Sequence, residues 1–222
     1  MPCLPWRAEF QAQARKAFTH QTYDNAHIVC TGVDPKLTIG ATRNKINEQA
    51  RSLGAEIIVH WDDDDWSHTH RIAEQVALLQ ATGADCVGYN EMLFWRDVSA
   101  TDKFNGEAWL YSNPNPRYAL GTSLCYWSRA WEARPFPDLQ HGEDTEWIRG
   151  LWCYGSAAVP EYVSEYVDGG YEPRMIARIH SGNSSSAYDP IEMARHNVLP
   201  WSERQWSRVP QWDQVCREAM ER

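Results

Sequence analysis

The sequence predicts an α/β fold in which short strands alternate with helices. Over the first 90 residues, brief apolar runs alternate with stretches whose apolar residues recur at helical spacing, a pattern typical of parallel βαβ units. A second observation is the apolar strand expected at 55–61, which runs into four consecutive aspartates. A third is the length of 222 residues, which is enough for an α/β domain with a full core. We therefore expect a single domain over 1–222.

The first half of the chain predicts three helices and the strands between them. Each expected helix places apolar residues on one face, and Gly54 and Gly83 end the second and third. The expected elements are helices at 7–20, 40–53 and 71–81, and strands at 27–31, 55–61, 85–89 and 92–95.

The second half predicts fewer and shorter elements. The expected elements are strands at 108–111, 119–127 and 174–180, and helices at 128–133 and 142–152. The helix at 142–152 has acidic residues in its first turn, where they suit the positive end of the helix dipole. The last 30 or so residues are rich in Trp, Glu and Arg and predict one or two helices lying over the core.

Composition limits the class of protein. The formal net charge of −9 argues against a broad electrostatic footprint for nucleic acid or an anionic membrane. No apolar run approaches the length of a transmembrane segment, and the first residues lack the apolar stretch of a signal peptide. The six cysteines are scattered without a C-x-x-C pair. We expect a cytoplasmic protein in a reducing compartment, without a disulfide framework.

The most informative stretch is the run of carboxylates from Asp62 to Asp65, bracketed by Trp61 and Trp66. Like charges this close repel one another unless they are solvated or neutralised by a cation. Because the run follows directly on an apolar strand, it predicts a seat for a hard divalent metal ion, which prefers oxygen ligands. The alternative is an acidic surface loop.

Three elements with acidic or metal-binding residues stand at the ends of separate expected elements. They are 62–65, Gly142-Glu143-Asp144 and Arg178-Ile179-His180. Further matching segments lie at 39–44, 71–79 and 119–123. In their order and spacing, these segments resemble the inverting nucleotide-sugar glycosyltransferases of family 2. The resemblance implies a GT-A fold, with a Rossmann-like mixed sheet flanked by helices and a helical C-terminal tail. It divides the chain into a nucleotide-sugar half at about 1–100, an acceptor and catalytic half at about 101–185, and a tail at about 186–222.

The resemblance implies a metal-binding D-x-D element formed by Asp62 and Asp64, with Asp64 as the direct ligand. It also implies that His180 completes the metal site. The alternative is a structural histidine at the end of a strand. Oxygen ligands suit Mg²⁺ or Mn²⁺, and one imidazole favours Mn²⁺. The ion would neutralise charge on the departing nucleoside diphosphate.

Asp144 resembles the catalytic base of the family, which takes the proton of the acceptor hydroxyl, with Glu143 beside it. Glu143 should raise the pKa of Asp144, whereas a helix N-terminus should lower it, and the sequence leaves the balance open. The alternative is an acidic pair that only begins a helix.

Donor binding is expected to involve Gly40 and Arg43 at the start of the second helix, together with Asp62 and Asp63. The charge of Arg43 would reach the donor phosphates, unless this residue is a solvated surface arginine.

The sequence departs from the family pattern in three places. It opens at Met1-Pro2-Cys3, so most of the usual first strand is absent. The second strand leads into 29–32 with Asp34 as the nearest carboxylate, which leaves the donor base open. The proline that usually follows the acidic cluster is missing.

The leading hypothesis is a metal-dependent, inverting glycosyltransferase that uses a nucleoside diphosphate sugar. Its acceptor is an unknown hydroxyl of a glycan, a lipid-linked sugar, a protein or a modified nucleobase. A second hypothesis is a metal-dependent phosphodiester hydrolase that uses the same carboxylates with His60, His68 and His70. A third is a non-catalytic relative that binds a nucleotide sugar or a saccharide.

Overall fold

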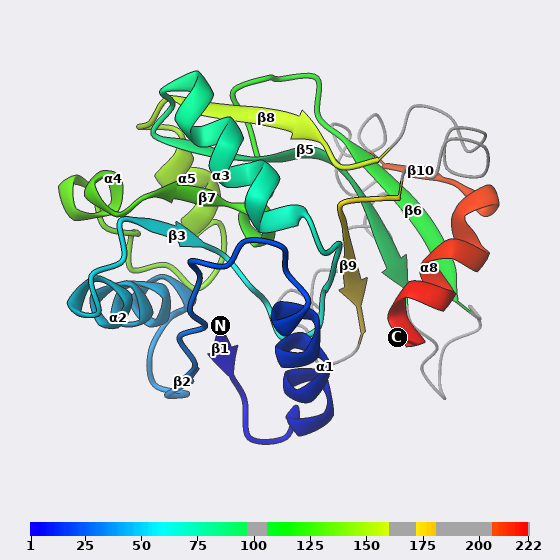
Figure 1. Ribbon diagram of the computed structural model, residues 1–222, viewed down its shortest axis with the longest axis horizontal. Helices are drawn as coiled ribbons and strands as arrows, with labels where there is room; N and C mark the ends of the chain where they lie inside the picture. Colours follow the sequence, from blue (N-terminus) through cyan, green and yellow to red (C-terminus); the bar gives the residue numbers. More distant parts are fainter. Residues whose placement is uncertain (97–105, 160–171, 181–205, 222) are drawn as a thin grey trace.

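The computed structural model describes residues 1–96, 106–159, 172–180 and 206–221 (Figure 1). The strands of these residues are β1 (Pro2–Cys3), β2 (Thr31–Gly32), β3 (Ile57–Val59), β4 (Trp66–Ser67), β5 (Cys86–Arg96), β6 (Glu107–Ser112), β7 (Cys125–Trp127), β8 (Cys153–Ala157), β9 (Met175–Ile179) and β10 (Trp206–Arg208). The helices are α1 (Ala8–Thr19), α2 (Ile39–Ser52), α3 (Arg71–Thr82), α4 (Ser128–Ala133), α5 (Glu143–Ile148) and α8 (Asp213–Glu221), with single 3₁₀ turns η1 (Gly121–Ser123) and η3 (Pro210–Trp212).

The larger sheet is mixed and is organised around the long strand β5. Its main path runs β10-β6-β5-β7-β3, and β5 also pairs in parallel with β8 and β9. Strands β6 and β7 pair with β5 in the antiparallel sense, and β3 pairs antiparallel to β7. Because β3 and β5 are both antiparallel to β7, the two run in the same direction on either side of it. The predicted α/β fold with a mixed sheet is confirmed, but this topology is not clearly Rossmann-like.

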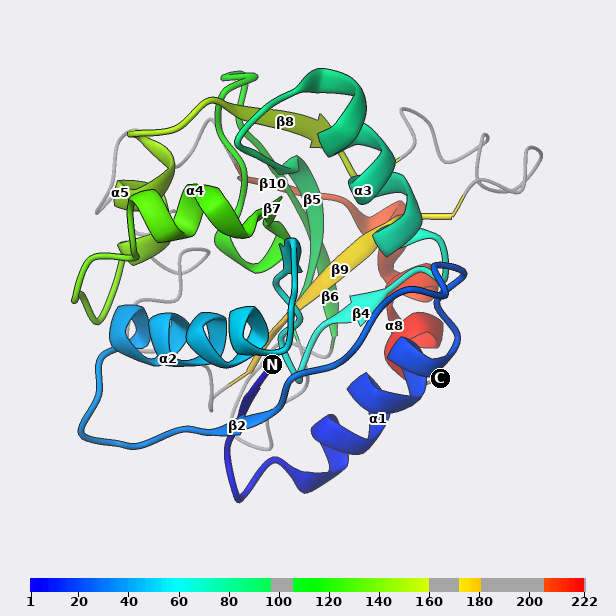
Figure 2. The same cartoon turned by 60° about the vertical axis from the view of Figure 1, so that its left-hand side comes forward.

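Helices cover this sheet and pack on one another (Figure 2). Helix α3 contacts β5 and β7, α8 contacts β5 and β6, and α2 contacts α4 and α5. Side chains such as Leu79 on α3, Leu93 on β5 and Trp147 on α5 are completely buried. Each buried side chain of this size contributes about 2 kcal/mol of transfer free energy. The core therefore fixes the ends of β3 and β9 and the starts of α2 and α5, from which the site described below is built.

Several expected elements differ in extent from the structure. The helix expected at 142–152 ends at Ile148, because the chain must turn at 149–151 to enter β8. The strand expected at 119–127 begins with the turn η1, and only β7 is paired. Of the strand expected at 27–31, only Thr31 is in a strand, the two-residue β2. The helices expected at 7–20, 40–53, 71–81 and 128–133 are confirmed within one residue at each end.

The C-terminal tail is helical only in part. Helix α8 agrees with the prediction, but Trp206–Arg208 forms the edge strand β10, which pairs with β6. Aromatic residues favour strands, and Trp206 packs against Phe94 and Tyr111, so cross-strand contacts outweigh the helical pattern here. Residues 186–205 lie outside the described part of the chain.

A disulfide joins Cys3 to Cys30, so the expectation of a chain without disulfides is wrong. The bond is not visible in the sequence because its partners are 27 residues apart, and only the parallel pairing of β1 with β2 brings them together. The four remaining cysteines are free and buried, as expected for small apolar residues. The cytoplasmic location stays a prediction. Within the described residues, no helix combines the length and apolar character needed to cross a bilayer.

Candidate functional site

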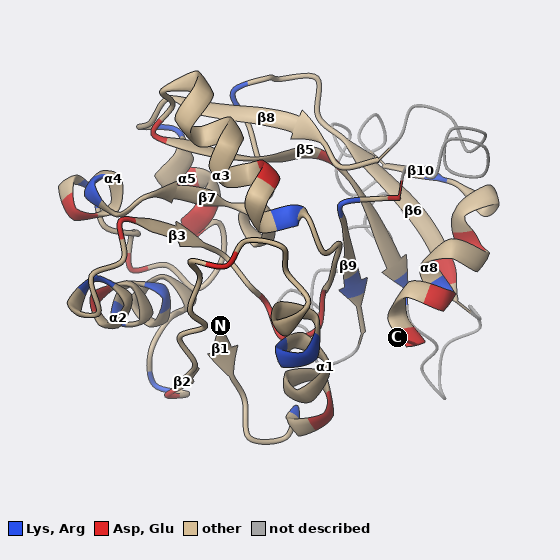
Figure 3. Cartoon of the chain, in the orientation of Figure 1, with Lys and Arg blue, Asp and Glu red and all other residues tan. Residues whose placement is uncertain are grey.

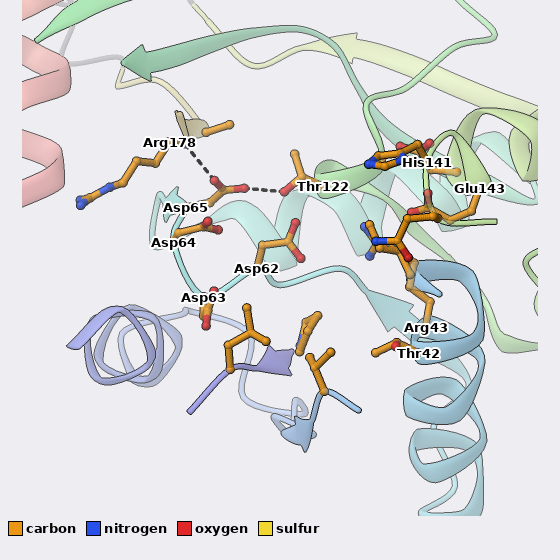
Figure 4. A pocket seen from close by; sticks show the side chains of 18 of the residues that line it. Thr42, Arg43, Asp62, Asp63, Asp64, Asp65, Thr122, His141, Glu143 and Arg178 are labelled. Carbon is orange, nitrogen blue, oxygen red and sulfur yellow. Dashed lines mark hydrogen bonds and ion pairs between the residues drawn. The ribbon is translucent and has the colours of Figure 1, made fainter. Parts of the chain in front are cut away.

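One cavity of about 660 Å³ brings together most of the residues that the sequence singled out (Figure 4). Its walls come from the segment before α1, the start of α2, the turn after β3, the turn η1, the segment that leads into α5, and the end of β9. The predicted residues among its lining are Arg43, Asp62, Asp63, Asp64, Glu143 and Asp144. Segments more than 100 residues apart therefore meet at this cavity.

The acidic run Asp62 to Asp65 forms the turn between β3 and β4, and the fold holds this turn at both ends. The buried guanidinium of Arg71 on α3 donates to the carbonyl oxygens of His60 at 2.9 Å and of Thr122 at 3.2 Å. The Asp65 carboxylate accepts from the Thr122 hydroxyl and from the backbone N–H of Arg178 at 3.0 Å. Asp65 is therefore a structural carboxylate that ties the turn to η1 and to β9.

Arg7 neutralises the middle of the acidic turn. Its Nη1 atom lies 2.9 Å from Asp63 Oδ1 and 2.9 Å from Asp64 Oδ2, and both carboxylates are buried. Burial raises the pKa of Asp63, although its bond with Arg7 acts in the opposite direction. No pattern in the sequence points to Arg7, because a single arginine before a helix, 56 residues from its partner Asp63, is not distinctive.

His180 lies against Asp64. The His180 Nε2 atom lies 3.0 Å from Asp64 Oδ2, and the imidazole packs 5.1 Å from the ring of Phe10. Burial raises the pKa of Asp64, but the hydrogen bond with His180 and the charge of Arg7 outweigh it, so that the pKa lies below its usual value. Asp64 is therefore held as a carboxylate between two basic groups.

Arg43 joins the two sides of the cavity. Its Nε donates to Glu143 Oε1 at 2.9 Å, and its Nη1 lies 3.0 Å from His60 Nδ1. Burial alone would lower the pKa of Arg43, but the charges of Asp62 and Glu143 raise it. Arg43 is therefore an ordered cation inside the cavity and not a solvated surface residue. In Figure 4 it faces Asp62 from the start of α2.

Glu143 and His60 share this network and have displaced pKa values. Burial raises the pKa of Glu143 and outweighs the charge of Arg43, which lowers it. Burial and then the charge of Arg43 lower the pKa of His60 well below its usual value, so the imidazole is neutral. His60 Nδ1 also lies 2.6 Å from the carbonyl oxygen of Gly121, which links the network to η1.

Asp144 sits at the start of α5, directly against Gly121. Its Oδ1 accepts from the backbone N–H of Thr145 at 2.6 Å. A Cβ added at Gly121 would overlap Asp144 Oδ2 and would lie 2.6 Å from Asp144 Cγ. Only glycine at 121 therefore allows the carboxylate this position on the cavity wall.

Gly40 does not line the cavity, although the sequence placed it among the donor-binding residues. Its N–H donates to the carbonyl oxygen of Leu139 at 3.1 Å, and an added Cβ would overlap the carbonyl oxygen of Pro137. In the structure, Gly40 lets the start of α2 approach the segment 137–139, and this approach places Arg43.

The chemistry of the acidic turn suits a divalent ion, although no complete site is assembled. Within the described ranges, no group of three or more His, Cys, Asp or Glu side chains is arranged to hold a metal ion. Asp64 and His180 nevertheless converge, and Asp63 Oδ2 is a buried oxygen without a hydrogen-bond partner among the described residues. Oxygen donors with one imidazole fit Mn²⁺ or Mg²⁺. In Figure 3, basic segments of α1 and β9 flank the red acidic turn.

The histidines of the hydrolase hypothesis are not assembled into one site. His60 is buried and contacts Tyr126 and Arg43. The rings of His68 and His70 lie 5.1 Å apart before α3, where His70 Nδ1 contacts Thr22 at 2.8 Å.

No protein family and no curated protein matches this sequence. The structure, in contrast, is similar to solved structures of S. aureus TarS. The match to TarS 1–349 in complex with UDP-GlcNAc has a TM-score of 0.53 at 12% identity, over 87% of this chain and 62% of that chain. The match to a second structure of S. aureus TarS has a TM-score of 0.53 at 12% identity, over 81% of this chain and 36% of that chain.

TarS is a family 2 glycosyltransferase with a GT-A fold. What this chain shares with it is the fold. At 12% identity, the similarity concerns the fold and not the function. The chain also spans less than two thirds of the length of each TarS chain. The structural resemblance to family 2 glycosyltransferases that the sequence predicted is thereby confirmed.

Proposed function

We propose that this protein is a metal-dependent glycosyltransferase that uses a nucleoside diphosphate sugar and inverts the anomeric configuration. The observation that supports the proposal most directly is the joint lining of one cavity by the acidic turn, Arg43 and Asp144. Each comes from a different element. The acidic turn has the negative charge to bind a metal ion, Arg43 the positive charge to face a diphosphate, and Asp144 a carboxylate that can accept the acceptor proton. The TarS-like fold supports the same assignment, since a TarS structure contains UDP-GlcNAc.

The acidic turn is the proposed seat of Mn²⁺ or Mg²⁺. Asp64 and His180 would hold the ion, with Asp62 as a further ligand from the same turn. When bound, the ion would act as a Lewis acid that neutralises charge on the departing diphosphate. Arg43 would supply a second, permanent positive charge from the opposite wall, and Asp62 and Asp63 complete the donor-facing side of the turn.

Asp144 is the proposed catalytic base. The acceptor oxygen forms a bond to the anomeric carbon while the bond from that carbon to the diphosphate oxygen breaks, and the acceptor proton passes to the Asp144 carboxylate. A single displacement of this kind inverts the anomeric centre. Glu143 does not take that proton in this proposal, because its carboxylate is bonded to Arg43. Its role is to hold Arg43 and the first turn of α5 in place.

Release of nucleoside diphosphate tests this proposal. The protein is incubated with Mn²⁺ and a panel of nucleoside diphosphate sugars that includes UDP-GlcNAc, with EDTA in the control reactions. We expect nucleoside diphosphate to appear with at least one donor and only with the metal. Cleavage of a phosphodiester without any sugar donor would instead support the hydrolase. Donor binding without turnover, also after addition of candidate acceptors, would support a non-catalytic binding protein.

A further inference from the structure

We propose that Arg7 is a positioning residue that acts as an internal cation, occupying the acidic turn and competing with a divalent metal ion for the carboxylate of Asp64. This inference rests on the proposed metal site and adds to it a residue to which neither the sequence nor the fold assigned a role. It predicts that metal binding and the position of α1 are linked.

The Arg7 charge lies against the Asp64 carboxylate that the proposed ion would use. A single nitrogen, Nη1, is 2.9 Å from Asp63 Oδ1 and 2.9 Å from Asp64 Oδ2, so one cation already contacts two adjacent carboxylates. The oxygen of Asp64 that Arg7 contacts is also the one that faces His180 Nε2. The side chains of Arg7, Asp63 and Asp64 are only 10%, 4% and 8% exposed, so solvent screens these charges weakly.

Helix α1 fixes Arg7 at this point. Arg7 is the residue immediately before the helix, and Phe10 in the first turn packs against the two basic residues at the end of β9. The Phe10 ring lies 5.1 Å from the His180 ring and 4.9 Å from the Arg178 guanidinium carbon. The same turn of helix therefore carries the internal cation and covers the proposed imidazole ligand.

A divalent ion and Arg7 cannot share Asp64 without a cost. Two cations a few ångströms apart in a weakly screened site repel strongly. Binding of the ion at Asp64 and His180 must therefore push Arg7 out of the turn, and loss of that contact loosens the start of α1. By linkage, any contact that holds Arg7 in place weakens the binding of the metal ion, and the bound ion weakens the docking of α1 by the same free energy.

The test compares Mn²⁺ affinity in the nucleotide-free protein by titration calorimetry. Arg7→Gln removes the charge and Arg7→Lys keeps it. We expect Arg7→Gln to bind Mn²⁺ about tenfold more tightly than wild type or better, and Arg7→Lys to stay within a few-fold of wild type. Arg15→Gln removes an equal charge from an exposed position of the same helix and is the matched control, for which the affinity should be unchanged.

The wild-type protein provides a second readout that needs no variant. Hydrogen exchange of the first hydrogen-bonded amides of α1, beginning with the Gln11 N–H that donates to the Arg7 carbonyl oxygen, should become faster when Mn²⁺ is added. It should not change with added Na⁺. If Arg7→Gln fails to fold, this measurement decides the question alone.

The outcomes separate the two proposals. Equal Mn²⁺ affinity of Arg7→Gln and wild type, with unchanged exchange in α1, would overturn the competition while leaving the metal site intact. No Mn²⁺ binding by either protein would overturn both the competition and the metal dependence. Binding of UDP-GlcNAc in the presence of EDTA would then show that the nucleotide-sugar part of the proposed function survives.

Discussion

Gly121→Ala should remove most of the activity of this protein without replacing any ionisable side chain. In the structure, an added Cβ would lie 2.6 Å from Asp144 Cγ and would overlap Asp144 Oδ2. Ordinary contact begins at 3.4 Å, so Asp144 Cγ must move away by roughly 1 Å and the overlapping Oδ2 by more. A displacement of about 1 Å at a reacting group costs on the order of 100-fold in rate, and overpacking of this kind costs about 1–3 kcal/mol of stability.

The assay follows release of nucleoside diphosphate from the best donor under single-turnover conditions, together with donor affinity and a thermal melt. We expect the rate to fall by about 100-fold while donor affinity changes little, because Asp144 is proposed to act on the acceptor side. Gly32→Ala is the matched control. Its added Cβ meets nothing within 4 Å, so activity should stay at the wild-type level.

A wild-type rate for Gly121→Ala would refute the reasoning at one of two points, and the melt tells which. If stability has fallen, the carboxylate was displaced and Asp144 is not the base. If stability is unchanged, the contact between Gly121 and Asp144 is not present in solution, and the geometry proposed for this wall of the cavity is wrong.

Four further predictions follow from individual contacts. Asp64→Asn should abolish Mn²⁺-dependent donor binding, measured by calorimetry with and without EDTA, and metal-dependent binding at wild-type strength would contradict the assigned ligand. Asp144→Asn should keep donor affinity but lower the transfer rate by about 10²–10⁴-fold, so a wild-type rate would exclude it as the base. Burial and the charge of Arg43 lower the pKa of His60 in the folded protein below its value of about 6.5 in the unfolded chain. The free energy of unfolding should therefore be unaffected by this group above about pH 6.5 and should fall below it, by up to about 1.4 kcal/mol per pH unit. Urea melts at pH 7 and pH 5 should show that the free energy of unfolding falls less between these pH values for His60→Gln than for wild type. Thiol titration of the denatured, unreduced protein should count the four free cysteines, and two more only after reduction of the bond between Cys3 and Cys30, whereas six thiols without reduction would contradict that bond.

Local patterns in the sequence were sufficient for the helices of the first half. Residues 40–53 and 71–81 have both helical periodicity and a glycine stop, and α2 and α3 begin and end within one residue of the predicted positions. Gly83 adopts the left-handed conformation (φ 64°) that a helix-ending glycine permits. Where a short aromatic segment has no such stop signal, tertiary contacts decide, as for Trp206 in β10.

The candidate site was predictable only where chemistry is concentrated in sequence. The aspartates of 62–65 and the pair Glu143-Asp144 stand out because several acids follow one another at the end of an element. Arg7 and Gly121 line the same cavity, but each is a single residue whose role depends on a partner more than 20 residues away. The role of Arg7 comes from the packing of α1 against β4, and that of Gly121 from the meeting of η1 with the first turn of α5, and no local pattern specifies either.

The structure also separates four aspartates that are equivalent by sequence. Burial, followed by the charges of Asp64 and Asp62, raises the pKa of Asp65 well above the usual range, so this residue is best suited to a structural hydrogen bond. The pKa of Asp63 is also raised, mainly by burial. Asp64 is the member whose pKa is lowered, because both His180 and Arg7 face it. A group that must bind a cation has to be ionised at neutral pH, and a carboxylate already stabilised by two basic neighbours meets that condition. Asp64 therefore keeps its negative charge at neutral pH, and in the structure that charge faces Arg7 and His180.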